Sequence, residues 1–371
     1  MSENPFLADI KNDLYCGIEV GDMRTRIYFI NSRTNERHND FPFPIQHLDA
    51  DTSAEEIANS IRAVRCILGK QKSWRADAKI ERVCILSPVN DINYLDEVKK
   101  AICKENISSK AGLPEKISWE NEIETMLKYH VPEGGLAIGL HVGVDVQCAV
   151  YSNRQTSSSS DASPETHGGA RWISREARLR SAADETNSFE RPQDPEMTLF
   201  PCAEVCRLFM KVFSASGEFE TSCLVVDSEN RKLLSDFGEL ITRNLKETLA
   251  AGQPGDPAVV ALVKDAGEEL GSIVLQAMNR HYSKADKEVV DVLICGDVER
   301  TTLLVSIEGF ASKFNHKDMK TVKLYRPREP TAAVAAIHAA DLEKITLKMD
   351  PWEEVYNIVY TEDGHKIVKI V

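Results

Sequence analysis

The sequence has no run of apolar residues that approaches the ~20 needed by a membrane-spanning helix, so no membrane partner is expected. The opening residues, MSENPFLADIKNDLY, lack a basic stretch followed by an apolar core, and no secretory signal is predicted. Basic charge is also scarce: 45 Lys and Arg oppose 58 Asp and Glu, which gives a net charge of -13. An acidic surface repels phosphate backbones, so no nucleic-acid partner is expected.

Cysteine pairs and the familiar catalytic signatures are missing as well. The nine cysteines are an odd number and lie scattered through apolar stretches. This usage is typical of free thiols in a reducing compartment, and we predict a cytoplasmic protein. The sequence contains no G-x-x-x-x-G-K-[ST] loop, no G-x-G-x-x-G after a strand, no G-x-S-x-G elbow and no H-E-x-x-H. These absences exclude the P-loop, Rossmann, α/β-hydrolase and zincin signatures as the source of any activity.

The chain is rich in patterned α/β structure. Its 371 residues suffice for two domains or one two-lobed unit, and a hydrophobic fraction of 42% predicts a buried core. Residues 14–30 read as two strands around a Gly-containing turn, and residues 135–152 repeat this style. Two such hairpins, each followed by helices, predict a duplicated α/β unit.

The remaining elements are predicted from the hydrophobic period. Strands are expected at residues 82–87, 222–227, 289–296 and 321–325. Helices are expected at residues 53–69, 91–103, 119–129, 229–250, 257–281 and 331–342, and another from about Thr301. The dipeptide Asp363-Gly364 predicts a tight turn between two strands at the end of the chain.

Residues 154–198 differ in character from the rest. The Ser-rich tract from Gln155 to Pro164 buries too little apolar surface to become ordered and is predicted to be a mobile loop. An arginine-rich stretch with one tryptophan follows, from Arg171 to Arg180. It reads either as a solvated helix face or loop, or as an insert that contacts an anion or a protein partner.

The turn of the first hairpin, GIEVGDMRTR (residues 17–26), resembles the first phosphate motif of the actin, hexokinase and heat-shock ATPase superfamily, roughly Asp-x-Gly-x-x-x-x-Arg. The resemblance implies that Gly21, Asp22 and Arg24 contact phosphate, since a Gly turn opens backbone amides to an anion. Glu19 stands at the family's Asp position, one methylene longer. It is implied as a catalytic residue and as a magnesium ligand through water.

The second hairpin, HVGVDVQ (residues 141–147), resembles the superfamily's second phosphate motif, Asp-x-Gly-Gly-Gly. His141 stands at the acid position and Gly143 is the one glycine left of the run, so both are implied as phosphate-binding residues. Asp145 is a candidate to replace the lost carboxylate in catalysis. These departures predict weakened phosphate chemistry.

Two later blocks extend the resemblance. VLICGDVERTTLL (residues 292–304) is similar to the adenosine segment, which implies adenosine contacts for Gly296, for Asp297 in place of a second glycine, and for Glu299. REPTAAVAAIHAA (residues 328–340) is similar to the small-residue helix that closes the second lobe against its partner.

Together the four blocks imply an α/β, two-lobed actin-like ATPase fold, built from two related mixed sheets flanked by helices, with ATP or ADP and Mg as cofactors. The expected parts are an N-terminal lobe (1–150), a mobile Ser-rich and Arg-rich insert (151–198), a C-terminal lobe (199–342) and a C-terminal β-hairpin (343–371). The likeness is greatest to stand-alone heat-shock-like and acetylglucosamine-kinase-like proteins.

Three functions remain open at this stage. The first is a nucleotide-binding protein with weak or no hydrolysis that acts as a conformational or interaction module. The second is a pseudoenzyme scaffold without nucleotide binding, with a protein partner on residues 154–198. The third is an ATP-dependent, sugar-type kinase, whose catalytic base would be Glu19, Asp91 or Asp145.

Overall fold

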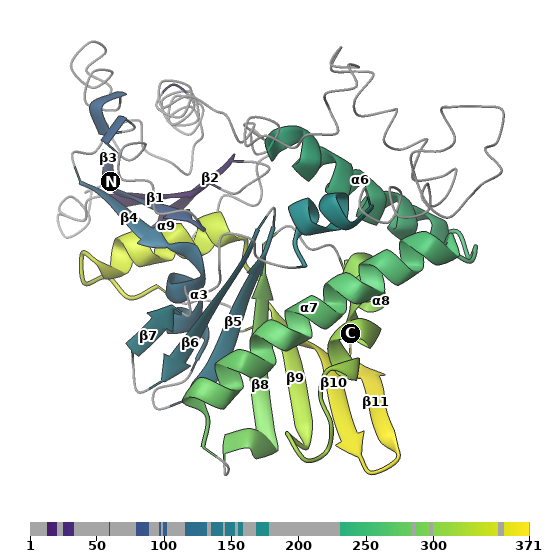
Figure 1. Cartoon of the computed structure of the whole chain (residues 1–371). Coiled ribbons are helices and arrows are strands. Elements are labelled where there is room, and N and C mark those ends of the chain that lie inside the picture. The colour runs from purple at the N-terminus through teal and green to yellow at the C-terminus, as the bar shows by residue number, and fades with distance from the viewer. Residues whose placement is uncertain are drawn as a thin grey trace, which may run out of the picture. The chain divides into compact units, whose positions relative to one another are not determined.

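The computed structural model describes residues 13–20, 25–32, 59, 79–88, 96–97, 99–101, 116–131, 135–143, 145–152, 155–158, 168–177, 231–283, 286–296, 300–347 and 352–370. The chain divides into two compact units (Figure 1). Unit 1 comprises residues 1–132 and 327–353, and unit 2 comprises residues 133–326 and 354–371. Each unit contains a mixed sheet with helices beside it, as the predicted fold class requires.

Unit 1 is built on a four-stranded sheet in the order β2-β1-β3-β4. β1 and β2 form the first predicted hairpin and are antiparallel, whereas β1, β3 and β4 run parallel. The elements are β1 (Asp13–Val20), β2 (Thr25–Asn31), β3 (Lys79–Ser87), β4 (Ile117–Asn121), α3 (Glu122–His130) and α9 (Thr331–Asp341). The predicted helix at 119–129 therefore begins three residues late, because its first residues pair with β3 as strand β4.

Helix α9 packs directly against the middle of β1. Its six alanines and its other residues from Thr331 to Ala340 are buried. A Cβ atom added at Gly17 of β1 would lie 1.9 Å from the Ala332 carbonyl oxygen and 2.3 Å from the Ala336 amide nitrogen. Small residues on both elements therefore bring helix and strand backbones into contact. Because of this packing, α9 belongs to unit 1, which differs from the C-terminal lobe (199–342) expected from chain order.

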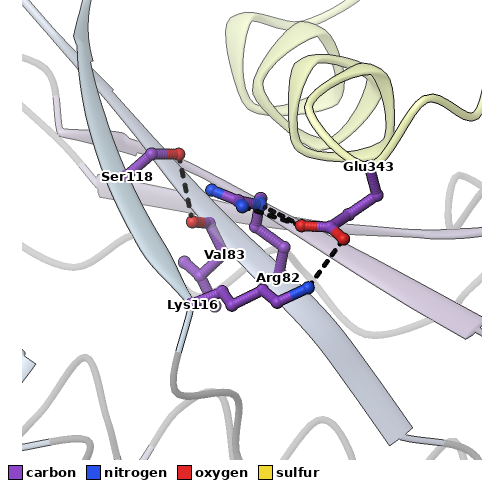
Figure 2. Close-up of polar contacts among 5 residues, drawn as sticks. All are labelled: Arg82, Val83, Lys116, Ser118 and Glu343. Atoms are coloured by element: carbon purple, nitrogen blue, oxygen red, sulfur yellow. Dashed lines mark hydrogen bonds and ion pairs between the residues drawn. The ribbon is translucent and has the colours of Figure 1, made fainter.

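The end of α9 is fixed to the sheet by a carboxylate that two basic residues share (Figure 2). Glu343 accepts hydrogen bonds from the Arg82 guanidinium at 2.7 and 2.8 Å and from Lys116 Nζ at 2.7 Å. These hydrogen bonds, that of Lys116 first, lower the pKa of Glu343. Lys344 follows in the left-handed region (φ 64°) and donates its amide to Asp341 at 2.8 Å, so the helix ends here.

A partly buried polar cluster joins α3 to α9 inside unit 1. The Tyr129 hydroxyl donates to Asp341 at 3.0 Å and lies 2.7 Å from His338 Nδ1. Because the hydroxyl has only one proton, His338 must donate from Nδ1 in this arrangement. The hydrogen bond and charge of His338 also lower the pKa of Glu120.

His130, the last residue of α3, is expected to make the protein sensitive to acid. It donates from Nδ1 to the Met126 carbonyl, packs edge-on against Trp352, and its buried Nε2 has no hydrogen-bond partner within the described residues. Burial lowers the pKa of His130 to about 2, from the ordinary histidine value near 6.5. Below pH 6.5 the His130 side chain therefore binds a proton in the unfolded chain but not in the folded chain. The free energy of unfolding consequently falls as the pH is lowered below 6.5.

The expected loss is about 1.4 kcal/mol for each pH unit below 6. Urea denaturation at pH 7.5, 6.5, 5.5 and 4.5 measures it, with His130→Gln as the matched variant. The variant should lose less stability than the natural chain between pH 6 and 4.5, since all other titrating groups are shared. Parallel pH profiles for the two proteins would show that His130 is protonated in the folded state.

Unit 2 is built on a seven-stranded mixed sheet in the order β11-β10-β9-β8-β5-β6-β7. The second predicted hairpin is β5–β6, and β5, β8 and β9 run parallel. The strands are β5 (Leu136–Val142), β6 (Val146–Ser152), β7 (Gln155–Ser158), β8 (Val289–Cys295), β9 (Thr321–Arg326), β10 (Glu353–Thr361) and β11 (Gly364–Lys369). The helical elements are a helix at 170–177, α6 (Arg231–Ala250), α7 (Pro257–His281), the short 3-10 helix η6 (Asp286–Glu288) and α8 (Arg300–Ser312).

Helices α7 and α8 cover one face of this sheet (Figure 1). Val274 and Met278 of α7 and Phe310 of α8 join the inward-facing residues of β5, β6, β8, β9 and β10 in one core. α7 begins at the Asp256 cap, whose side chain accepts from the Ala258 amide at 2.8 Å, with Pro257 at its first position. The predicted helix at 257–281 is confirmed to the residue.

The expected domain boundaries differ from the two units. The β5–β6 hairpin was expected in the N-terminal lobe (1–150), but β5 pairs with β8 and lies in unit 2. The C-terminal hairpin expected within 343–371 forms as β10–β11, yet it extends the sheet of unit 2 and is no separate part. Chain order could not reveal these pairings, because strand partners are chosen by tertiary packing.

Part of the expected mobile insert (151–198) forms regular secondary structure. Gln155–Ser158, the start of the Ser-rich tract, pairs with β6 as strand β7. Residues 170–177, from the arginine-rich stretch, form a helix whose Ile173 and Ala177 are buried against α6 and α7. The predicted strand at 222–227 and almost all of the predicted helix at 53–69 lie outside the described residues. No helix among the described residues is long and apolar enough to cross a membrane.

Candidate functional site

The first hairpin, in unit 1, places an arginine on its candidate catalytic carboxylate. Glu19 of β1 and Arg26 of β2 are cross-strand partners, and Arg26 Nη1 donates to Glu19 Oε2 at 3.2 Å. Glu19 is only 5% exposed. The carboxylate that was expected to hold the water shell of magnesium is thus buried beside a guanidinium that neutralises it. Gly21, Asp22 and Arg24, the expected phosphate contacts, lie outside the described residues.

The second hairpin, in unit 2, closes on itself at its turn. The Gly143 amide donates to the Asp145 carbonyl at 3.2 Å, so this amide is engaged within the turn. His141, at the family's acid position, pairs in register with Gln147 of β6 and Cys295 of β8 and is only 3% exposed. His141 therefore lies on an inner strand of the unit 2 sheet, and its side chain is buried.

The helix at 170–177 begins beside this turn. Its Ala170 amide donates to the Gly143 carbonyl at 2.9 Å. Arg171 Nη2 donates to Asp145 Oδ2 at 2.8 Å, and both side chains are partly exposed. Asp145, the second candidate for catalysis, therefore has an arginine partner, as Glu19 does in unit 1.

The sequence did not predict this arginine partner for Asp145. The available signal was the arginine-rich stretch itself, which stands out in an acidic chain. Twenty-six positions separate Arg171 from Asp145, and that segment includes the Ser-rich tract. No spacing rule connects two residues across such a segment.

The adenosine-type segment supplies a third turn, at the end of β8. Gly296 has φ 96°, in the left-handed region that favours glycine. A Cβ atom at this position would lie 2.4 Å from the Val142 carbonyl oxygen of β5. β5 and β8 are parallel neighbours, so the turns after Val142 and after Cys295 lie at the same edge of the sheet. Asp297 and Glu299 lie outside the described residues.

The described residues do not fit a magnesium ion. Mg²⁺ prefers carboxylate oxygens in an octahedral shell with several waters. Glu19 and Asp145 each accept from an arginine, and a nitrogen ligand such as His141 suits softer metals. Within the described ranges, no three His, Cys, Asp or Glu side chains gather as metal ligands.

Comparison with solved structures identifies the fold. The chain is similar to a candidate N-acetylglucosamine kinase from Porphyromonas gingivalis, with 11% identity and a TM-score of 0.50 over 87% of this chain and 98% of that one. It is also similar to a ROK family glucokinase from Streptomyces griseus, solved with glucose and AMPPNP, with 12% identity and a TM-score of 0.51 over 89% of this chain and 98% of that one. The predicted actin-like ATPase fold, built from two mixed sheets flanked by helices, is confirmed. By sequence, neither a protein-family model nor a curated protein matches the chain.

Proposed function

We propose that the protein binds a nucleotide, hydrolyses it weakly or not at all, and acts as a conformational or interaction module. One observation carries the proposal: the candidate carboxylate of each hairpin is bound by an arginine of its own unit, Glu19 by Arg26 and Asp145 by Arg171. Both carboxylates are therefore engaged before any ligand arrives.

Phosphoryl transfer explains why this arrangement weakens hydrolysis. The reaction needs metal ions to offset charge on the phosphates and a carboxylate to orient the attacking oxygen. A carboxylate that accepts from a guanidinium is a poorer base and a poorer metal ligand, because the guanidinium already stabilises its charge. A fold can keep its nucleotide site while losing these groups, since chemistry belongs to the site residues.

Nucleotide binding is supported by the retained turn at Gly296 and by the fold. Gly296 keeps the left-handed backbone and the close approach to β5. The glucokinase with the same fold was solved with AMPPNP, an ATP analogue. Gly296 itself is unsuited to mutational tests, because any side chain there would collide with the Val142 carbonyl and disturb the sheet.

Thermal unfolding with and without nucleotide tests the proposal. Millimolar Mg-ATP, Mg-ADP and metal-free ATP are compared with buffer alone. A ligand present at about 100 times its Kd stabilises the folded state by about 2.7 kcal/mol, which raises Tm by several degrees. Phosphate release, measured in parallel, should fall at least about a thousandfold below the roughly 1–100 s⁻¹ typical of kinases.

The two alternative functions give different results in the same experiment. No shift with any nucleotide, in a cooperative melt, would contradict nucleotide binding and leave a scaffold. Rapid turnover on addition of glucose or N-acetylglucosamine would make the protein a sugar-type kinase, the activity named for the two solved relatives. A protein partner on residues 154–198 stays a prediction.

A further inference from the structure

We infer that the phosphate group of the nucleotide is held at the second hairpin by Arg171, and that binding does not require magnesium. The inference rests on the proposed function. It adds two points to that function: which residue gives the phosphate its affinity, and that binding is independent of a metal ion. In the actin-like fold a divalent metal is expected to offset phosphate charge, whereas the described residues of this chain offer an arginine instead.

The position of Arg171 is the first argument. Its helix is fixed at the hairpin turn by the Ala170–Gly143 hydrogen bond of 2.9 Å. Ile173 and Ala177 of the same helix are buried against α6 and α7. A packed helix therefore holds Arg171 beside the turn of the second phosphate-type motif. The Gly296 turn lies at the same edge of the sheet as this hairpin turn.

The unused capacity of the guanidinium is the second argument. Arginine offers five N–H donors in a planar fork that matches the oxygens of a phosphate. Arg171 Nη2 binds Asp145, while its buried Nε has no hydrogen-bond partner within the described residues. The side chain as a whole is 31% exposed, so an anion from solvent can reach parts of it other than the enclosed Nε.

The third argument is the poor fit of the motif to a metal. His141 replaces the acid, and Asp145, the nearest carboxylate of the motif, already binds a cation. A net charge of -13 means that an anionic ligand needs local positive charge. Arg171 supplies such a charge at the hairpin without an ion.

Asp145 then acts as an internal competitor for the phosphate. Its carboxylate occupies the guanidinium, so an incoming phosphate must displace it or share the donors. Removing the carboxylate charge should tighten binding, and removing the guanidinium should weaken it. These opposite effects distinguish a ligand-binding arginine from one that only stabilises the hairpin.

Titration calorimetry with ADP and ATP, in EDTA and in millimolar Mg²⁺, tests the inference on the full chain. The natural protein should bind with a Kd that changes less than about threefold between the two conditions. Arg171→Gln should raise Kd roughly tenfold to a hundredfold, the range for losing a charged hydrogen bond. Asp145→Asn should lower Kd by about threefold to tenfold, because it leaves the neighbouring guanidinium to the phosphate.

Two further variants serve as controls. Arg175→Gln changes an exposed arginine one turn along the same helix, with the same change of net charge, and should leave Kd unchanged. The double variant Asp145→Asn/Arg171→Gln removes both charges of the pair and should bind as weakly as Arg171→Gln. Tm values of all variants show whether each one folds.

Each outcome decides a separate point. Metal-independent binding that Arg171→Gln weakens and Asp145→Asn tightens supports the inference. Binding that appears only with Mg²⁺, or an Arg171→Gln protein that folds and binds as the natural one, overturns the inference but leaves the proposed function standing. The absence of binding under both conditions overturns the proposed function itself.

Discussion

Gly267→Val is expected to destabilise unit 2 by about 3–5 kcal/mol and to lower its melting temperature by about 10 °C or more. Gly267 lies on α7 where the backbone of α8 comes closest. A Cβ atom there would lie 1.7 Å from the Ser306 carbonyl oxygen. The colliding atom belongs to a helix backbone, so no side-chain rotation relieves the overlap and the two helices must separate.

The other glycines of this contact give a ranking that can be checked. A Cβ atom at Gly309 of α8 would lie 1.8 Å from the Lys264 carbonyl oxygen, and one at Gly271 would lie 2.7 Å from that of Phe310. Gly267→Ala and Gly309→Ala should therefore be the costlier changes, and Gly271→Ala the milder one. Guanidinium denaturation of the three alanine variants measures the order.

The matched control for Gly267→Val is Ala261→Val, which puts the same side chain at an exposed position of α7. It should cost less than about 1 kcal/mol, the helix-propensity difference between alanine and valine. If Gly267→Val proved as mild as Ala261→Val, the close approach of α7 and α8 would be contradicted.

Gly17→Val is expected to destabilise unit 1 by a similar amount, about 3–5 kcal/mol. Its Cβ would lie 1.9 Å from the Ala332 carbonyl oxygen and 2.8 Å from Ala335 Cβ. The valine would force α9 away from β1. That shift would open the core in which Ala335 and Ala339 pack against Tyr15, Cys84 and Leu86.

A second substitution, at Ala335, tests whether the valine at position 17 collides with the backbone of α9 or only with a side chain. Ala335→Gly removes the 2.8 Å contact but leaves the 1.9 Å contact with the backbone, so it should not restore the stability of Gly17→Val. Gly252→Ala is the control for the loss of a glycine, since nothing lies within 4 Å of a Cβ there and only its φ of 72° opposes the change. It should cost about 1 kcal/mol. Rescue by Ala335→Gly would contradict the backbone contact.

The candidate site was predictable only as far as its local motifs reach. Both hairpins formed where the Gly turns and alternating strands predicted them, and Gly296 took the left-handed turn after its strand. Turn glycines and strand periodicity act between near neighbours, so they can be read from a single sequence. The roles assigned to Gly21, Asp22, Arg24, Asp297 and Glu299 remain predictions, because those residues lie outside the described ranges.

Local sequence patterns could not predict which cation lies beside each candidate carboxylate. Glu19 and Arg26 lie seven residues apart on one hairpin, and only the strand register makes them partners. Asp145 finds Arg171 across a Ser-rich segment because Ile173 and Ala177 bury the helix of Arg171 against α6 and α7. A carboxylate in a motif is a candidate ligand until the fold shows which cation lies beside it.

The sequence by itself determined the α/β class, most strands and helices, and the two hairpins, because these depend on periodicity and turn residues within a few positions of one another. Only the tertiary structure decided that α9 covers the first sheet, that the second hairpin joins the second sheet, and that Glu19 and Asp145 each pair with an arginine. Those outcomes depend on which surfaces fit when distant segments meet. Close packing allows only segments whose surfaces fit to pair, and the carbonyl oxygen of Ser306 against Gly267 is an example, because no side chain larger than hydrogen fits there.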